Sequence, residues 1–331
     1  MKIDAPSPQG SPMALRPLLA AIGLALCCNV AGAADTGASV APNPSSPTAA
    51  RKAVVPRAYF ATPQEGFDAL VAAMRNNDGR EVARILGPGH ARIVDSGDAA
   101  ADQLAAAGFV ADYDKKHAVE MDGDAQAFIV TGESDWPMPV PMIKADQGWT
   151  FDARAGEKEL LARRVGRNEL DTIQTCLAFI DMQTEYAEAD RNGDGLLEYA
   201  ARFISSPGRH DGLYWPTAAG EAPSPAGPLF ADANQQYRQN VATPYHGYYY
   251  RILTAQGKHA PDGAMNYFAN GKLIGGVALI AYPATYRNSG VKSFICSMSE
   301  LVYEKDLGPQ TSSVARKIKT FDPDASWTKV N

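Results

Sequence analysis

Residues 168–198, NELDTIQTCLAFIDMQTEYAEADRNGDGLLE, predict a long amphipathic helix that runs into a sharp polar turn. Apolar or small residues recur on one helical face over about five turns, and we expect this face to pack on a core. These residues are Leu170, Ile173, Leu177, Ile180, Thr184 and Ala187. A shorter helix over Glu157–Val165 is expected to end at Gly166, after which Asn168 and Asp171 can cap the long helix.

The turn after this helix has the D-x-N-x-D-G opening of a calcium-binding loop. Ca2+ prefers roughly six to eight oxygen ligands, and alternate residues of such a turn point inward. The expected ligands are Asp190, Asn192, Asp194, the carbonyl of Leu196, and Glu198. The twelfth position holds Ala201, where an EF-hand has a bidentate Glu, so the loop would need outside ligands or bind weakly. The alternative is a solvated turn between two helices.

The remaining pattern predicts an antiparallel sheet beside the long helix, in a domain over residues 166–331. Tyr199–Ser205 and Phe230–Asn240 are expected to be short helices. The expected strands are Tyr248–Thr254, Met265–Ala269, Gly276–Tyr282, Val291–Cys296 and Glu300–Glu304. Asn270-Gly271 predicts a turn between strands.

Residues 58–165 predict a separate α+β domain, with helices first and antiparallel hairpins afterwards. Thr62 and Glu65 fit a capping box at the start of the first helix. A later helical pattern is expected to point Leu104, Phe109 and Tyr113 inward. Asp122-Gly123 predicts a hairpin turn. This order resembles the cystatin-like or nuclear-transport-factor-2-like cone, a fold that serves both enzymes and inert modules.

The N-terminus has the pattern of an export signal. The apolar run Pro17–Val30 is shorter than the roughly 20 residues of a membrane-spanning helix. It is followed by Ala31-Gly32-Ala33, which predicts a signal peptide over residues 1–33. We therefore expect an exported protein of the periplasm or the medium.

Residues 34–57 are rich in Ala, Pro and Ser and are expected to form a flexible linker. A lipoprotein anchored through Cys27 or Cys28 is the minor alternative to signal-peptide cleavage after residue 33. Cleavage would leave Cys176 and Cys296, which could pair in an oxidising compartment or remain buried thiols. The sequence leaves these two alternatives open.

Composition and charge exclude several classes of protein. The chain has 331 residues, of which 45% are hydrophobic and 21% are charged, as is ordinary for a globular protein. The net charge of −6, without a basic stripe, argues against a nucleic-acid partner. No apolar run long enough to span a membrane follows residue 33.

Aromatic and titratable residues of the second domain make up a candidate ligand groove. Its members are His210, Asp211, Tyr214, Trp215, Tyr245, His246 and Tyr248. The tyrosine run is also typical of a half-buried strand with rings on both faces. A hydrolytic cleft would need His210, His246 and a carboxylate within about 3 Å of one another. The sequence has no G-x-S-x-G, H-E-x-x-H or nucleotide-binding motif, so no catalytic residue is assigned.

Six segments together resemble a bacterial family catalogued as domain of unknown function 2950. They are Asp135–Pro137, Gly166–Glu169, Asp190–Tyr199, Asp211–Pro216, Pro244–Tyr249 and Val302–Gly308. The resemblance extends over residues 58–329. It implies location and fold more than function, because the family has no established activity.

The second domain alone is similar to the globular head of type IV pilins and pseudopilins. The similarity rests on the long helix followed by Gly247–Ala255, Gly290–Phe294 and Leu301–Glu304. Major pseudopilins also carry a calcium loop, though later in the chain. The chain departs from these families because no prepilin leader or apolar half-helix precedes Leu170. The resemblance therefore implies a pilin-head relative that acts outside the filament as an adaptor.

Three functional hypotheses follow from the sequence. The leading one is a non-enzymatic exported protein that binds another cell-envelope protein. The second is an envelope hydrolase or glycan-binding protein with a cleft around His210 and His246. The third is a structural Ca2+ protein, in which Asp190–Glu198 pins the long helix.

Overall fold

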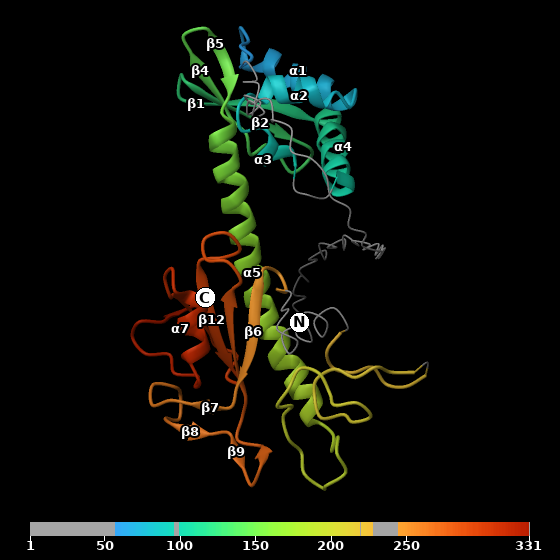
Figure 1. Cartoon of the computed structure of the whole chain (residues 1–331), viewed down its shortest axis with the longest axis vertical. Coiled ribbons are helices and arrows are strands. Elements are labelled where there is room, and N and C mark those ends of the chain that lie inside the picture. The colour runs from blue at the N-terminus through green and yellow to red at the C-terminus, as the bar shows by residue number, and fades with distance from the viewer. Residues whose placement is uncertain (1–56, 96–98, 219, 228–243, 331) are drawn as a thin grey trace, which may run out of the picture. The chain divides into compact units, whose positions relative to one another are not determined.

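The structure is a computed structural model that describes residues 57–95, 99–218, 220–227 and 244–330 (Figure 1). The predicted signal peptide, the predicted linker up to residue 56 and the predicted helix over Phe230–Asn240 lie outside the described residues. The described helices and antiparallel sheets confirm the α+β class.

Four helices precede an antiparallel sheet in the first part of the chain. The helices are α1 (Pro63–Arg75), α2 (Gly79–Leu86), α3 (Ala91–Val94) and α4 (Ala99–Lys115). The strands are β1 (His117–Asp122), β2 (Gln126–Thr131), β3 (Trp136–Pro137), β4 (Met142–Ala145) and β5 (Gly148–Phe151). Their order is β1-β2-β4-β5, with β3 paired to β2. The order of elements predicted for residues 58–165, with helices before hairpins, is therefore present.

These helices and strands enclose one hydrophobic cluster. Its fully buried members include Phe67, Leu70, Ile85, Ile129, Met142 and Phe151. Two of the rings, Phe67 and Phe151, meet edge to face with their centroids 5.3 Å apart. Thr62 caps α1 as predicted, since its hydroxyl accepts a hydrogen bond from the Glu65 N–H at 3.2 Å.

Helix α4 turns a different face to this cluster than the sequence suggested. Tyr113 is buried and its hydroxyl donates to Asp68, but Leu104 is 75% exposed. The prediction for Leu104 was wrong because five residues advance a helix by about 500°, which places Leu104 and Phe109 about 140° apart.

One helix, α5 (Ala153–Ala187), replaces the two helices expected on either side of Gly166. Asp152 caps α5 by accepting hydrogen bonds from two backbone N–H groups of its first turn. Asn168, the expected cap, instead donates to the Ser289 carbonyl at 2.8 Å. A single glycine costs a helix only about 1 kcal/mol, and packing on both sides of it outweighs this cost. The predicted boundary between residues 165 and 166 therefore falls inside a continuous helix.

The buried face of α5 is rotated from the predicted one. Leu170, expected inside, is 65% exposed, whereas a face of mixed polarity is buried. The face consists of Thr172, Thr175, Cys176, Phe179, Ile180, Gln183 and Tyr186. Both threonine hydroxyls donate to carbonyls one turn earlier in α5, at 2.7 Å. Polar side chains can therefore lie in this interface without an unpaired donor.

Tyr199–Ser205 is bent and extended, not helical as predicted. Its backbone groups are bonded elsewhere. The buried amide of Gln183 exchanges two hydrogen bonds with the backbone of Ala200, at 2.9 and 2.8 Å. The Tyr199 N–H donates to the Leu273 carbonyl at 2.8 Å. These groups are therefore unavailable for helical hydrogen bonds.

The last part of the chain forms a five-stranded antiparallel sheet in the order β14-β13-β12-β11-β6. Its strands are β6 (Tyr248–Leu253), β11 (Ala278–Pro283), β12 (Lys292–Ser297), β13 (Val302–Asp306) and β14 (Thr328–Lys329). Two short pairs accompany it: β7 (Ala255–Gln256) with β8 (Met265–Asn266), and β9 (Phe268–Ala269) with β10 (Lys272–Leu273). The predicted Asn270-Gly271 turn joins β9 to β10. Strand β14 and helix α7 (Thr311–Lys317) were not predicted.

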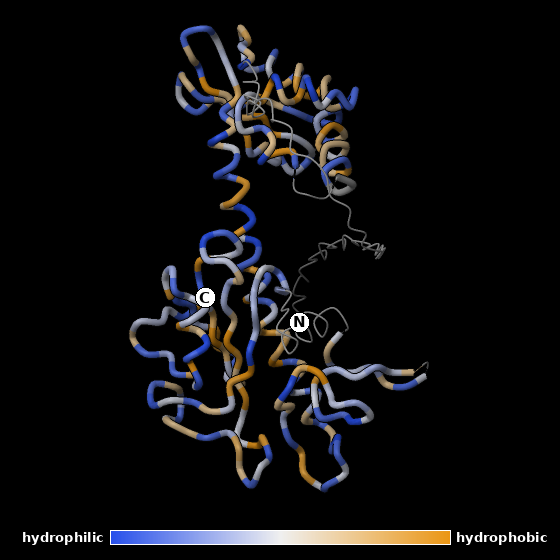
Figure 2. Tube along the Cα trace, viewed as in Figure 1, coloured by the Kyte–Doolittle hydropathy of each residue, from blue (hydrophilic) through white to orange (hydrophobic). Residues whose placement is uncertain are grey.

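Strand β11 is buried at all six positions, because α5 and α7 both pack against this sheet. Successive side chains of a strand point to opposite faces. On β12, Cys296 contacts α5, while Ile295 lies with residues of α7. Figure 2 shows hydrophobic stretches along these strands and more hydrophilic residues in the loops around them. No helix in the described ranges has both the length and the hydropathy needed to cross a membrane.

Gly156 and Gly166 provide a matched test of a continuous α5. A Cβ on Gly156 would lie 2.7 Å from a Val140 methyl group, whereas a Cβ on Gly166 would meet nothing within 4 Å. We expect Gly156→Leu to lower the free energy of unfolding by about 1–3 kcal/mol through overpacking. Gly166→Ala should raise it by roughly 0.5–1 kcal/mol, measured by urea unfolding. A destabilised Gly166→Ala variant would contradict helical geometry at this residue.

Candidate functional site

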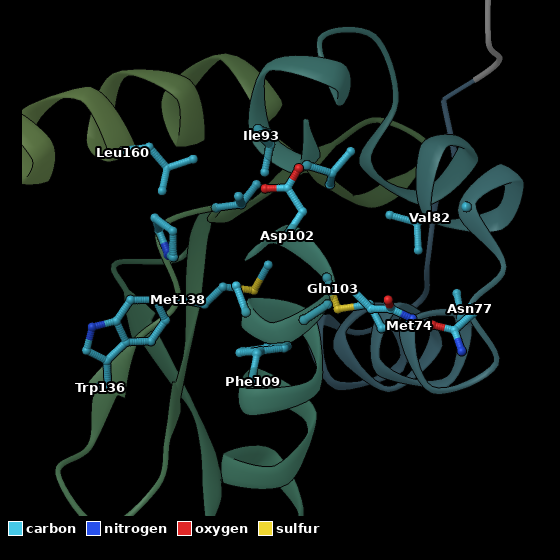
Figure 3. A pocket seen from close by; sticks show the side chains of 17 residues that line it. Met74, Asn77, Val82, Ile93, Asp102, Gln103, Phe109, Trp136, Met138 and Leu160 are labelled. Atoms are coloured by element: carbon cyan, nitrogen blue, oxygen red, sulfur yellow. The ribbon is translucent and has the colours of Figure 1, made fainter. Parts of the chain in front are cut away.

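A cavity of about 470 Å³ opens among the helices and β3 of the first part of the chain (Figure 3). Its apolar lining includes Met74, Val82, Ile93, Phe109, Met138 and Leu160. Three polar side chains also reach it: Asn77, Asp102 and Gln103. This volume lies within the range of about 300–1,000 Å³ that is typical of ligand pockets, which are mostly apolar with few polar groups.

Local sequence explains how the helical wall of the cavity is built. The α1–α2 corner turns at Asn77, which has a positive φ of 52°, a conformation that Asn tolerates better than most residues. Asp78 then caps α2 by accepting hydrogen bonds from two backbone N–H groups, at 3.1 and 3.0 Å. This tight corner places Asn77 and Val82 in the cavity lining, to which α4 adds Gln103 (Figure 3).

The opposite wall comes from β3 and the proline-rich residues after it. The Met138 N–H donates to the Ile129 carbonyl at 2.8 Å, which holds this irregular segment against β2. Met138 is buried, and Trp136 is 45% exposed at the rim. Pro137 and Pro139 break the strand pattern here, so side chains turn into the cavity instead of extending a ladder.

Arg163 of α5 fixes the rim. Its guanidinium carbon lies 4.9 Å from the centroid of the Trp136 ring, and its Nη1 donates to the Pro137 carbonyl at 2.8 Å. Its Nε donates to Glu159 at 2.7 Å. Cation–π contact and these hydrogen bonds together hold the half-exposed indole in one orientation. The rim is therefore preorganised before any ligand arrives.

The predicted calcium loop is closed by its own carboxylates. The two carboxylate oxygens of Asp190 accept hydrogen bonds from the backbone N–H groups of Gly193, at 2.8 Å, and Gly195, at 2.7 Å. The Gly195 bond is the main reason that the pKa of Asp190 lies below its ordinary value. Asn192 donates its amide to Glu198 at 2.6 Å.

A lysine ammonium lies against the same loop. Lys272, on β10, pairs with Asp194 and lies 3.4 Å from Glu198. The pair with Asp194 raises the pKa of Lys272 and lowers that of Asp194. The Leu196 N–H donates to Asp194 at 3.1 Å. The structure thus gathers Asp190, Asn192, Asp194 and Glu198 in one loop.

In the described part of the chain, no group of three or more His, Cys, Asp or Glu side chains is arranged to hold a metal ion.

The His210 side of the predicted groove forms a compact aromatic stack. The His210 and Trp215 rings are stacked with centroids 4.3 Å apart, and Arg191 lies 5.6 Å from the Trp215 centroid. Tyr186 of α5 donates its hydroxyl to the His210 carbonyl at 2.7 Å. Burial, with the nearby carboxylate of Glu198, raises the pKa of Tyr186 to about 12.

Asp211 and Tyr214 make hydrogen bonds with nearby residues of the same stretch of chain. Asp211 accepts hydrogen bonds from the Ser206 N–H at 2.6 Å and the Ser206 hydroxyl at 3.0 Å. Burial acts to raise the pKa of Asp211, but these bonds and Arg202 outweigh it and leave the pKa lowered. Tyr214 exchanges backbone hydrogen bonds with Phe203 and Ser205. Asp211 therefore remains an ionised partner of its own turn.

The tyrosine run over residues 245–250 lies beside an earlier part of α5 than the His210 cluster does. His246 Nδ1 is 3.2 Å from a carboxylate oxygen of Asp171, and the Tyr245 ring meets the His246 ring at 4.2 Å. Tyr248 is fully buried and donates to the Lys292 carbonyl at 2.9 Å.

The predicted groove is therefore two separate clusters. Asp171, which contacts His246, and Tyr186, which contacts His210, are fifteen positions apart on α5, or about 22 Å along its axis. The structure does not bring His210 and His246 together with a shared carboxylate.

The cavity was not predicted from the sequence because its lining comes from five helices, one strand and two loops that are separate in the chain. The segments that carry the family resemblance include only Trp136 of this lining. The available signal was the odd stretch Trp136–Val140, in which prolines alternate with large apolar residues. No local pattern predicted that Lys272 would pair with the loop, because Lys272 and Asp194 are 78 positions apart in the chain.

Comparison with known proteins adds the family. Residues 57–330 match the family described as "Protein of unknown function (DUF2950)". The chain belongs to this family. No curated protein and no solved structure gives a match. The DUF2950 match covers both hydrophobic clusters and α5, so the cavity and the acidic loop both lie within the family region.

The Lys272–Asp194 pair gives a pH-dependent prediction. The pKa of Asp194 is lowered from its ordinary 3.8 in the folded chain, so its stabilising contribution is complete above that value and is lost as the pH falls through the folded value. We expect Lys272→Met to lower the Tm by a few degrees at pH 6 and much less once the pH has fallen below the lowered pKa of Asp194. Lys319→Met removes an exposed lysine and is the matched control. A Tm difference independent of pH would contradict the ion pair.

Proposed function

We propose that this DUF2950 chain is an exported, non-enzymatic binding protein. It holds an apolar segment of another cell-envelope protein in the cavity that Met74, Phe109 and Met138 help to line. The observation that carries this proposal is an apolar cavity of about 470 Å³ with a half-exposed tryptophan fixed at its rim. Tryptophan and arginine are enriched among the residues that dominate binding energy at protein interfaces. Trp136 and Arg163 supply that pair here.

The lining favours adaptable contact with apolar side chains. Met74 and Met138 face the cavity from opposite walls, and methionine adjusts its shape to different apolar partners (Figure 3). Phe109 and Leu160 add apolar surface. Burial of one large apolar side chain contributes about 1.5–3 kcal/mol, so two or three inserted side chains contribute roughly 3–9 kcal/mol, from which the entropic cost of association is subtracted.

The polar lining favours a peptide over a lipid chain. Asn77 and Gln103 carry amides that can both donate to and accept from a peptide backbone. A bound peptide must satisfy its backbone groups when it is desolvated, whereas an acyl chain has no such groups.

The proposed architecture and location follow the sequence. We infer a cone-like first domain, a pilin-head-like second domain, and export after cleavage behind Ala33. The order of α1 to β5 and the packing of α5 on an antiparallel sheet support the two domain descriptions, and the export signal in the sequence supports the location. Export places the cavity where cell-envelope proteins are available as partners.

A cavity-blocking variant tests the proposal. Ala106 lines the cavity on α4, whereas its neighbour Ala107 does not. We expect the fluorescent apolar dye 1-anilinonaphthalene-8-sulfonate to bind the purified protein and to lose at least tenfold in affinity in Ala106→Trp. Ala107→Trp, the same substitution on an outward position, should bind like wild type. Equal binding by both variants would contradict an accessible cavity.

A photocrosslinking analogue of leucine at position 160, which lines the cavity, then tests the partner in cells, with position 161, which does not line it, as control. We expect one envelope protein to be captured at 160 and not at 161, and a synthetic peptide of its crosslinked segment to displace the dye. Capture of lipid at 160, or a captured peptide that leaves the dye in place, would overturn the peptide assignment.

We also propose that the acidic loop binds Ca2+ in competition with the Lys272 ammonium. The supporting observation is that Lys272 already places a positive charge between Asp194 and Glu198, two of the expected ligands. A divalent cation there must displace this charge, so the unmodified loop should bind weakly.

Calorimetric titration with CaCl2 checks this second proposal. We expect Lys272→Met to bind Ca2+ at least tenfold more tightly than wild type, because the competing charge is removed. The double variant Lys272→Met, Asp190→Asn should lose that gain. Absence of heat from Lys272→Met, under conditions where its circular dichroism is unchanged, would exclude a calcium site.

A further inference from the structure

The two cysteines of the described chain meet in the core. Cys176 lies on α5 and Cys296 on the central strand β12, and both side chains are 0% exposed. The Cys296 thiol lies 3.7 Å from the Cys176 carbonyl oxygen, to which it donates. Burial raises the pKa of the Cys296 thiol well above its ordinary value, and a hydrogen bond with the Cys176 thiol raises it further. The structure thus brings the Cys296 thiol against Cys176, and both residues are free thiols in it, although 120 positions separate them in the chain.

Surrounding contacts hold the two cysteines in this register. Two turns before Cys176, Glu169 accepts hydrogen bonds from the Val291 and Lys292 N–H groups at the start of β12, at 2.8 and 3.0 Å. On the other side of β12, Cys296 is paired with Leu279 of β11 and Val302 of β13. Glu169 thus joins α5 to the start of β12, and strand pairing fixes the position of Cys296 within the sheet.

The cysteine count favours a single pairing. The sequence has four cysteines, and Cys27 and Cys28 fall within the predicted signal peptide. Cleavage behind Ala33 leaves Cys176 and Cys296 with no competing thiol. Disulfides form and persist in the compartments to which exported proteins are delivered.

We propose that Cys176 and Cys296 form an internal disulfide in the exported protein, which links α5 to β12. The inference rests on the export in the proposed function and is independent of the cavity. One thiolate attacks the disulfide of an oxidant, either an oxidised dithiol oxidoreductase or a small-molecule disulfide, and releases one thiol of it. The second thiolate then attacks the mixed disulfide. Two protons leave the cysteines, and the oxidant is reduced to two thiols.

Burial dictates when this step takes place. Neither thiol reaches solvent in the folded chain, and the thiolate is the reactive form. The exchange therefore occurs during folding, before the sheet closes over α5. Once formed, the bond is shielded from reductants by the same packing.

Thiol counting tests the proposal. The full chain, including residues 1–33, is expressed in cells that export it. The cells are precipitated with acid, and the protein is alkylated with N-ethylmaleimide in denaturant, so that buried thiols also react. We expect no alkylated cysteine in the denatured mature protein and a non-reduced peptide pair that contains Cys176 and Cys296. Two alkylated cysteines in a protein whose sequenced N-terminus is Ala34 would overturn the pairing.

A second arm separates pairing from export. The same chain without residues 1–33, refolded with oxidised glutathione, should form the bond whether or not cells export the protein. Failure there would refute the disulfide, whereas an uncleaved N-terminus in cells would refute export alone. We expect the oxidised protein to melt roughly 10 °C above the reduced one. The double variant Cys176→Ala, Cys296→Ala should not respond to reductant. Dye binding at the cavity should be unchanged in all forms.

Discussion

The packing of α5 is the constraint on which the rest of the structure depends. Gly156 lets the start of the helix approach Val140 more closely than any side chain would allow. Further along, Phe179 and Tyr186 are buried in the second hydrophobic cluster. Burial of such residues contributes about 1.5–3 kcal/mol each, against about 1 kcal/mol lost at Gly166. The helix is therefore continuous: its start packs against Val140 of the first cluster, and its later turns belong to the second cluster.

Hydrogen bonds from α5 also determine the course of the chain after it. The side-chain amide of Gln183 takes the two backbone hydrogen bonds that Ala200 would make in a helix. The residues around Ala200 are therefore extended. That segment leads to the stacked His210 and Trp215, held by the Tyr186 hydroxyl. The acidic loop over residues 190–198 lies in the chain between α5 and this extended segment, and Lys272 ties it to β10. Buried polar groups on one helix thus organise a long stretch that has little regular secondary structure.

The two parts of the chain carry different chemistry. The first holds an apolar cavity whose rim is fixed by an arginine and a tryptophan, and this arrangement suits binding. The second holds charged and aromatic clusters whose groups bond mainly to one another and to the backbone. His210 and His246 each belong to a different cluster, so the geometry supports recognition in the first part better than catalysis in the second.

Local sequence was enough to predict the α+β class, the cap of α1 at Thr62, and the positions of the main strands, because caps, turns and period-two patterns are local signals. Short motifs such as Asp211–Pro216 also indicated the family, since a motif is read from consecutive residues. Tertiary structure decided the rest. Gly166 remained helical and Leu170 became exposed because contacts with distant strands outweighed local preference. The cavity, the Lys272 pair and the meeting of Cys176 with Cys296 join residues that are far apart in the chain, and no local pattern encodes such contacts.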